Sequence, residues 1–258
     1  MVQVIRGVIF DLGSTLLSFD AVWGDVMHQA QEVLAEQLHR SGLNLDPAVF
    51  AARFRQEMDA YYHEREAEFV EITTAHVLHK VLADMGHLAI SAEIVHNALQ
   101  QMYAVSEAHW QPMPGVYEVL DGLRRSGRKL GMISNAGDDA NVQRLIDRAH
   151  LRPYFDPILI SAAVGLRKPN PALFATVLTA WHLQPVEAVM IGDTLGADIL
   201  GAQSAGLHQI WLTTEADTPA NRAHAGTIIP EFSAASLAEL PALIDHMGAT
   251  SLRSGPNA

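Results

Sequence analysis

Hydrophobic and polar residues follow two different periods along the chain. A run of apolar residues from Val4 to Phe10 stops abruptly at Asp11, which predicts a short buried strand. From about Asp20 to Glu107, apolar residues recur every three or four positions with polar residues between them, which predicts amphipathic helices and no strand. After Pro112, short apolar runs alternate with helical patterns. The chain is therefore expected to hold a helical insertion after the first strand of an α/β domain.

Strands and helices are expected to alternate after the insertion, which is typical of a parallel sheet with right-handed crossovers. The helices of the insertion are predicted near residues 22–38, 47–62, 71–85 and 91–107. Later helices are predicted at 116–126, 141–149, 171–182, 198–205 and 237–247, and strands at 129–133, 157–160, 188–191, 208–212 and 227–229. The predicted domains are an α/β core at 1–17 and 113–248, a helical domain at 18–112, and a flexible tail at 249–258.

Composition and charge narrow the class of protein. Hydrophobic residues make up 49% of the 258 residues, enough for a sizeable core. The 17 basic and 29 acidic side chains give a formal net charge of −12, which argues against a nucleic-acid or anionic-membrane partner, because both need a basic surface. The absence of cysteine excludes disulfides and thiolate metal sites. Since the sequence shows neither a signal peptide nor an apolar run of membrane length, we expect a soluble cytoplasmic protein.

Polar side chains follow the predicted strands. Asp11 follows the first strand, Ser134-Asn135 the second and Asp193 the fourth, while Lys168 lies in the loop after the third. Because the carboxyl ends of parallel strands share one edge of a sheet, we expect these residues to face one crevice. Two carboxylates can hold a hard cation such as Mg²⁺, and a lysine beside a hydroxyl and an amide can hold phosphate oxygens. Asp11 could then act as a nucleophile, although a single aspartate after a strand more often belongs to a turn.

Four stretches of the chain resemble the motifs of the haloacid dehalogenase-like (HAD) hydrolase superfamily. The resemblance is to the branch with a helical cap after the first strand (the C1 cap of subfamily I), and it covers nearly the whole chain. It implies a Rossmann-like parallel sheet with an inserted all-helical cap. The matching stretches, in order and each after a predicted strand, are Phe10-Asp11-Leu12-Gly13-Ser14-Thr15-Leu16, Met132-Ile133-Ser134-Asn135, Gly165-Leu166-Arg167-Lys168-Pro169-Asn170-Pro171 and Ile191-Gly192-Asp193-Thr194-Leu195-Gly196-Ala197-Asp198.

The resemblance implies a role for each residue that would meet a phosphate group. Asp11 is expected to be the nucleophile and to form an aspartyl-phosphate intermediate. Lys168 is expected to steady both this carboxylate and the phosphoryl oxygens. Ser134 is expected to bind phosphate through its hydroxyl, with the backbone or side chain of Asn135 beside it. The implied substrate is a small phosphorylated metabolite.

The resemblance also implies a Mg²⁺ site, with one departure from the pattern of the family. Mg²⁺ is expected to bind Asp11, Asp193 and the backbone carbonyl of Gly13, with Thr15 and Asp198 in support. Family phosphatases usually carry a second aspartate at the position of Gly13, where it protonates the leaving group and then activates water. Gly13 keeps the carbonyl but lacks this carboxylate. Loss of a general acid and base typically removes a factor of about 10² to 10⁴ in rate.

Three functions are therefore considered. The first is a Mg²⁺-dependent phosphatase. The second is a metal-independent 2-haloacid dehalogenase, a branch that usually has an aromatic residue at position 13 and lacks the Gly192-Asp193 pair. The third is a catalytically weakened member that binds a phosphorylated ligand or a protein. Five side chains of the insertion could reach a substrate, although such residues are more often ordinary polar or interfacial positions of helices: Arg53, Arg55, Tyr61, Tyr62 and Arg65.

Overall fold

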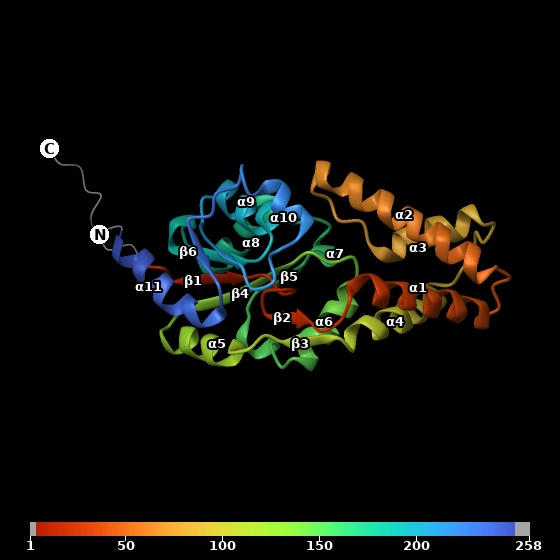
Figure 1. The fold of residues 1–258 in the computed structure, drawn as a ribbon, viewed down its shortest axis with the longest axis horizontal. Helices are drawn as coiled ribbons and strands as arrows, with labels where there is room; N and C mark the ends of the chain where they lie inside the picture. Colours follow the sequence, from red (N-terminus) through yellow and green to blue (C-terminus); the bar gives the residue numbers. More distant parts are fainter. Residues whose placement is uncertain (1–3, 251–258) are drawn as a thin grey trace.

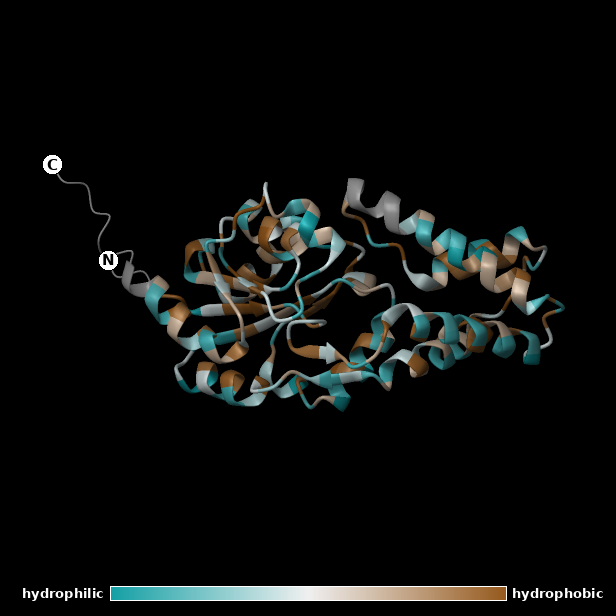
Figure 2. Ribbon diagram, in the orientation of Figure 1, coloured by the Kyte–Doolittle hydropathy of each residue, from teal (hydrophilic) through white to brown (hydrophobic). Residues whose placement is uncertain are grey.

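The computed structural model describes residues 4–250, with their side chains except those of 62–68 and 248–250. It places an α/β core beside an elongated bundle of helices (Figure 1). The strands of the core carry mostly hydrophobic residues, whereas the helices of the bundle show mixed hydrophobic and hydrophilic surfaces (Figure 2). Within the described part of the chain, none of the helices has both the length and the hydropathy that crossing a membrane requires.

The core is built on a six-stranded sheet in the order β5-β4-β1-β6-β7-β8. Every neighbouring pair in this sheet is parallel. All residues of β1 are buried, as expected for a central strand covered on both faces. The strands are β1 (Gly7–Phe10), β4 (Lys129–Ser134), β5 (Ile158–Ile160), β6 (Ala188–Gly192), β7 (His208–Leu212) and β8 (Phe232–Ala234).

Alternate residues of the strands pack against helices on opposite faces of the sheet. Val8 and Phe10 pack with α5, α6 and α11, while Ile9 and Met190 pack with α8 and α9. This alternation follows from the period of two in a strand. The helices of the core are α5 (Val116–Arg125), α6 (Asp139–Arg148), α7 (Ser161–Val164), α8 (Pro171–Trp181), α9 (Leu200–Ser204), α10 (Pro219–His224) and α11 (Leu240–Thr250).

The insertion folds into four helices with a separate hydrophobic core. They are α1 (Trp23–Arg40), α2 (Pro47–Glu68), α3 (Thr74–Asp84) and α4 (Ala92–Glu107). Asp46 caps α2 by accepting from two backbone N–H groups, as its place before Pro47 predicts. The predicted fold class is confirmed: an α/β core with a parallel sheet carries an inserted helical region that forms a cap.

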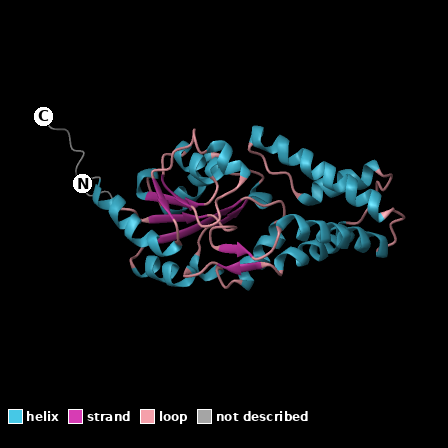
Figure 3. Cartoon of the chain, viewed as in Figure 1, coloured by secondary structure: helices cyan, strands magenta, loops and turns pink. Residues whose placement is uncertain are grey.

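The expectation of a purely helical insertion misses a small ribbon at its base (Figure 3). Strands β2 (Leu17–Phe19) and β3 (Trp110–Pro112) pair antiparallel, and they form a sheet apart from the main one. Each strand finds its partner at the other end of the insertion. A three-residue segment has no local periodicity that could reveal such a partner.

The predicted strand at 227–229 is wrong. The amides of Thr227 and Ile228 donate to the carbonyl of His224 and close the end of α10 instead. The sixth strand of the sheet is β8, which pairs with β7 and buries Ala234. The predicted tail lies outside the described residues from 251 onward.

The helix predicted at 198–205 begins earlier than expected. It opens with a π-helical turn, Leu195–Ile199, and continues as α9. Such turns are rare and occur often at functional sites. Here the turn carries Asp198 directly behind the strand end that carries Asp193.

Candidate active site

The strand-end residues meet above the carboxyl edge of the sheet. Asp11 follows β1, Ser134 ends β4, and Asp193 follows β6, the strand next to β1. Lys168 reaches them from the loop between α7 and α8. These side chains and the cap helices line one cavity of about 850 Å³, so the space above the sheet edge is enclosed by both parts of the chain.

The ammonium group of Lys168 lies at the centre of the site. The residue is 2% exposed. Its Nζ donates to Asp11 Oδ1 at 2.6 Å and to the carbonyl of Ile133 at 2.6 Å, and it pairs with Asp198 Oδ1 at 2.7 Å. Burial lowers the pKa of Lys168, but the charges of Asp11 and Asp198 outweigh burial and raise it overall. The side chain therefore stays charged and fixes one carboxylate oxygen of Asp11.

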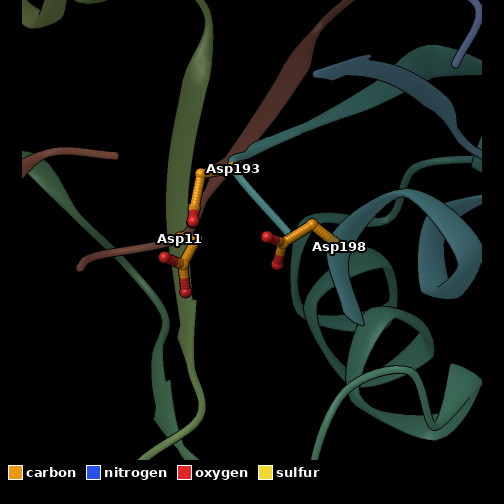
Figure 4. A group of neighbouring side chains, drawn as sticks. All are labelled: Asp11, Asp193 and Asp198. Atoms are coloured by element: carbon orange, nitrogen blue, oxygen red, sulfur yellow. The ribbon is translucent and has the colours of Figure 1, made fainter. Parts of the chain in front are cut away.

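Three carboxylates converge beside this lysine. One oxygen each from Asp11, Asp193 and Asp198 lies within 4.8 Å of the other two, and Figure 4 shows all three side chains around one space. Burial, followed by the charges of Asp11 and Asp198, raises the pKa of Asp193 to about 8. Burial also raises the pKa of Asp198 to about 6, with Lys168 opposing the rise and Asp11 adding to it. Burial and neighbouring carboxylates thus disfavour the charged forms of Asp193 and Asp198 more than Lys168 favours them.

The donor set fits a hard divalent cation. Three carboxylates and one ammonium leave a formal charge of −2, which a divalent cation cancels. Asp198 is occupied on both oxygens, since Oδ1 pairs with Lys168 and Oδ2 accepts from the backbone N–H of Thr194 at 3.0 Å. The hydrogen bonds from threonine hydroxyls to the Asp193 carboxylate are long, at 3.4 Å from Thr15 and 3.3 Å from Thr194. Asp11 and Asp193 are therefore better placed to bind a metal than Asp198.

Ser134 and Asn135 lie where the sequence pattern predicts, but their side chains do different things. Ser134 is buried and lines the cavity. The amide of Asn135 donates from Nδ2 to the carbonyl of Lys168 at 3.0 Å and accepts from its backbone N–H at 2.8 Å. The Asn135 side chain thus holds the backbone that carries Lys168.

Gly13 lines the cavity beside Asp11, and the ring of Trp110 occupies the space next to it. A Cβ atom on Gly13 would lie 3.2 Å from Cη2 of Trp110 and 3.6 Å from Cζ3. The φ angle of Gly13 lies outside the left-handed region, so the backbone itself would accept another residue. A neighbouring ring, and not backbone strain, is what crowds a side chain at this position.

Two residues that the sequence pattern did not single out position Asp193. Asn221 donates from Nδ2 to the carbonyl of Asp193 at 2.8 Å, and Trp211 donates from Nε1 to the same atom at 2.7 Å. Asn221 also accepts from the backbone N–H of Leu195 at 2.8 Å. No sequence signal marks them, because Asn221 belongs to a short helix that was not predicted and Trp211 fits an ordinary strand.

A second group missed by sequence analysis ties the cap to the core. The buried carboxylate of Glu71 accepts from Ser161 Oγ at 2.7 Å and from the Tyr61 hydroxyl, and it lies 3.9 Å from Nε of Arg167. The backbone N–H of Glu71 donates to the carbonyl of Gly165 at 3.1 Å. The segment before α3 is thereby attached to the loop that carries Lys168.

The five cap side chains considered from the sequence lie in different places. Tyr61 is buried against Glu71 and is absent from the cavity lining. Arg55 lines the cavity and donates to Gln31 at 3.0 Å, whereas Arg53 is not among the lining residues. The side chains of Tyr62 and Arg65 lie outside the described residues.

Comparison with known proteins places the chain among hydrolases. The family model of haloacid dehalogenase-like hydrolases matches residues 5–206. The human haloacid dehalogenase-like hydrolase domain-containing protein 3 is 29% identical over 214 residues, which cover 79% of this chain and 80% of that protein. The pyrimidine 5'-nucleotidase YjjG of Escherichia coli is 37% identical over 134 residues, covering 52% of this chain and 56% of the relative.

Solved structures share the fold at lower identity. A 2-haloacid dehalogenase from Pseudomonas syringae pv. Tomato DC3000 superposes with a TM-score of 0.66 at 23% identity, over 94% of this chain and 99% of that one. The HAD-hydrolase YfnB from Bacillus subtilis, bound to magnesium, superposes with a TM-score of 0.59 at 22% identity, over 94% of this chain and 99% of that one. At these identities the likeness concerns the fold alone.

Proposed function

Because the chain belongs to the family of haloacid dehalogenase-like hydrolases, we propose that it is a Mg²⁺-dependent phosphatase of a small phosphorylated molecule. The observation that carries the proposal is the charge of the site. The formal charge of −2 around Asp11 and Lys168 matches a divalent cation. A dehalogenase that works without metal does not require this excess of negative charge. Relatives that are named as phosphatases and nucleotidases support the same class of reaction.

The residues of the chain divide the work of such a reaction. Asp11 attacks phosphorus with the carboxylate oxygen that Lys168 does not hold, and the bond from phosphorus to the leaving oxygen breaks. Lys168 holds the other carboxylate oxygen of Asp11 and offsets charge on the phosphoryl oxygens. Ser134 donates its hydroxyl to one of these oxygens. Water then attacks the aspartyl-phosphate, which releases inorganic phosphate and restores Asp11.

The carboxylates of Asp11 and Asp193 and the backbone carbonyl of Gly13 would hold the metal. Mg²⁺ bound there supplies positive charge to the phosphoryl oxygens. Thr15 and Asp198 support this arrangement by contacting its residues. Thr15 donates to Asp193, and Asp198 holds Lys168.

The position of Gly13 limits what the site can cleave. With no carboxylate two residues after Asp11, nothing at that position can hand a proton to the departing oxygen. A leaving group that is stable as an anion hardly needs such a proton, whereas an alkoxide does. The proposed substrates are therefore phosphates with good leaving groups.

The experiment compares phosphatase and dehalogenase activity in one purified protein. Release of phosphate from p-nitrophenyl phosphate and acetyl phosphate is measured with Mg²⁺ and with EDTA, and release of chloride is measured from 2-chloropropionate. Phosphate release that requires Mg²⁺ and disappears in Asp11→Asn supports the proposal. Asp25→Asn, which alters an exposed carboxylate on α1, serves as the matched control and should retain activity. Chloride release in EDTA would establish the dehalogenase instead, and no turnover of any substrate would favour the binding protein.

A further inference from the structure

Three aromatic rings cluster where the cap joins the core. Phe19 lies edge-on against Trp23 and against Trp110, with 5.0 Å between ring centroids in both pairs. Trp23 and Trp110 lie 6.2 Å apart, also edge-on. Both tryptophans line the cavity above Asp11, whereas Phe19 is not among its lining residues. We call Trp23 and Trp110 the tryptophan pair.

The tryptophan pair presents apolar surface to the cavity. Trp23 is 51% exposed, a large fraction for such a side chain. Trp23 is not part of the hydrophobic core of the cap. The packing of the cap helices therefore does not explain why a tryptophan stands at this exposed position. An exposed aromatic surface inside a ligand cavity favours a flat apolar ligand, because stacked and edge-on rings attract each other beyond the burial of area.

Trp110 lies close to the reacting carboxylate. Its ring borders the space that a side chain at position 13 would fill, two residues after Asp11. A group that leaves phosphorus on the cap side of Asp11 therefore meets an aromatic ring where family phosphatases offer an acid. The ring that crowds a side chain at position 13 also supplies a surface for stacking.

We propose that the tryptophan pair binds the leaving group and that the substrate class is the aryl phosphates. The inference rests on the proposed phosphatase function and specifies its substrate. An aryl leaving group suits both the missing acid at position 13 and the aromatic surface of the tryptophan pair. As a phenolate it spreads its negative charge over the ring and can leave without a proton, and its flat face packs on indole. The phosphoryl group transfers to Asp11 as the bond from phosphorus to the aryl oxygen breaks, and the phenolate takes its proton from water after it leaves.

The first experiment separates stacking from leaving-group quality. Both p-nitrophenyl phosphate and acetyl phosphate have good leaving groups, but only the former has a ring. Trp110→Leu is expected to raise KM for p-nitrophenyl phosphate about tenfold and to leave KM for acetyl phosphate unchanged. Phe19→Leu is the matched control, because it removes a ring from the same cluster that does not line the cavity. Equal effects of Trp110→Leu on both substrates would overturn the proposal.

The second experiment does not depend on turnover. Calorimetry with Mg²⁺ present compares the binding of phenylphosphonate and methylphosphonate. Both have a P–C bond in place of the P–O bond that a phosphatase cleaves, so they are not hydrolysed. The wild-type protein should bind phenylphosphonate about tenfold more tightly, and Trp110→Leu should abolish the difference. Equal affinities in the wild type would refute the role of the tryptophan pair. If that preference is present but no phosphate is hydrolysed, the phosphatase proposal fails and the aryl-binding surface stands.

The third experiment exchanges the ring for an acid. Gly13→Asp alone should lower activity on all phosphates, because its Cβ meets Trp110 at 3.2 Å and the carboxylate needs the same space. The double variant Gly13→Asp with Trp110→Gly has room for the carboxylate. It should raise kcat/KM for glycerol phosphate, relative to kcat/KM for p-nitrophenyl phosphate, by about 10²-fold. A melting temperature close to that of Trp110→Gly alone shows that the variant is folded, and an unchanged ratio in this folded protein would contradict the proposal.

Discussion

Replacing Lys168 by methionine should destabilise the protein through charge alone. Methionine has a similar length and fills the buried space, but it removes an ammonium that contacts three oxygens at 2.6, 2.6 and 2.7 Å. In the described part of the chain, Lys168 supplies the only ion pairs of Asp11 and Asp198, so both carboxylates lose their cationic partner. Removal of one member of a buried ion pair costs about 3–5 kcal/mol. Lys168 is 2% and Asp198 1% exposed, so solvent does little to reduce this cost.

The effect should depend on pH in a defined direction. Lys168 lowers the pKa of both Asp193 and Asp198, so its loss raises them above the present values of about 8 and about 6. An acid whose pKa is higher in the folded state binds more protons when folded, and it therefore reduces stability as the pH rises. The penalty of Lys168→Met should be largest near pH 8 and should shrink toward pH 5, where Asp193 and Asp198 of the variant are protonated.

Thermal unfolding measures the effect without reference to activity. About 4 kcal/mol corresponds to a fall in Tm of roughly 8–16 °C for a chain of this size. Mg²⁺ should raise the Tm of Lys168→Met more than that of the wild type, because the variant site is more negative and binds the cation more tightly. Lys129→Met is the control, since the side chain of this exposed lysine donates to a neutral acceptor, the carbonyl of Trp181, at 3.0 Å. A loss of Tm that is equal at pH 5 and pH 8, or no larger than in Lys129→Met, would refute the reasoning.

Three further predictions concern the metal site and the attachment of the cap. Mg²⁺ should bind more tightly as the pH rises from 6 to 8, by up to about tenfold per pH unit, because the pKa of Asp193 is raised to about 8 and the metal competes with a proton. Calorimetry in two buffers should detect the released proton, and an affinity independent of pH would contradict this prediction. Asp193→Asn should weaken Mg²⁺ binding by at least about tenfold while circular dichroism stays unchanged; an unaltered affinity would place the metal elsewhere. Glu71→Gln should cost about 1–3 kcal/mol and speed proteolytic cleavage at 18–20 and 111–115, because a buried acceptor shared by cap and core is lost; Glu57→Gln, which alters an exposed ion pair with Lys80, should do neither.

The local pattern of the sequence predicted much of the fold. Strand β7 matches its predicted range, and strand β4 and helix α8 differ from theirs by a single residue. The reason is that hydrophobic periods of 2 and 3.6 residues depend on near neighbours in the chain. The same reasoning placed Asp11, Lys168 and Asp193 at one edge of the sheet, since parallel strands end together.

Contacts between distant segments were beyond that reasoning. Nothing near Gly13 in the sequence indicates the ring of Trp110, and nothing near Glu71 indicates the hydroxyl of Ser161. Asn221 is a similar case, because it holds Asp193 from a helix of six residues without a periodic pattern.

The sequence by itself determined which chemical groups the site contains, because residue types and strand ends are local properties. Only the tertiary structure decided the charge balance around Lys168 and the surface that a leaving group meets. Charges and rings act through space over a few ångströms, and the residues concerned come together only when the cap and the core pack. The spacing of motifs therefore predicts a phosphate site, while the proposed aryl substrate rests on the position of Trp110 beside Gly13.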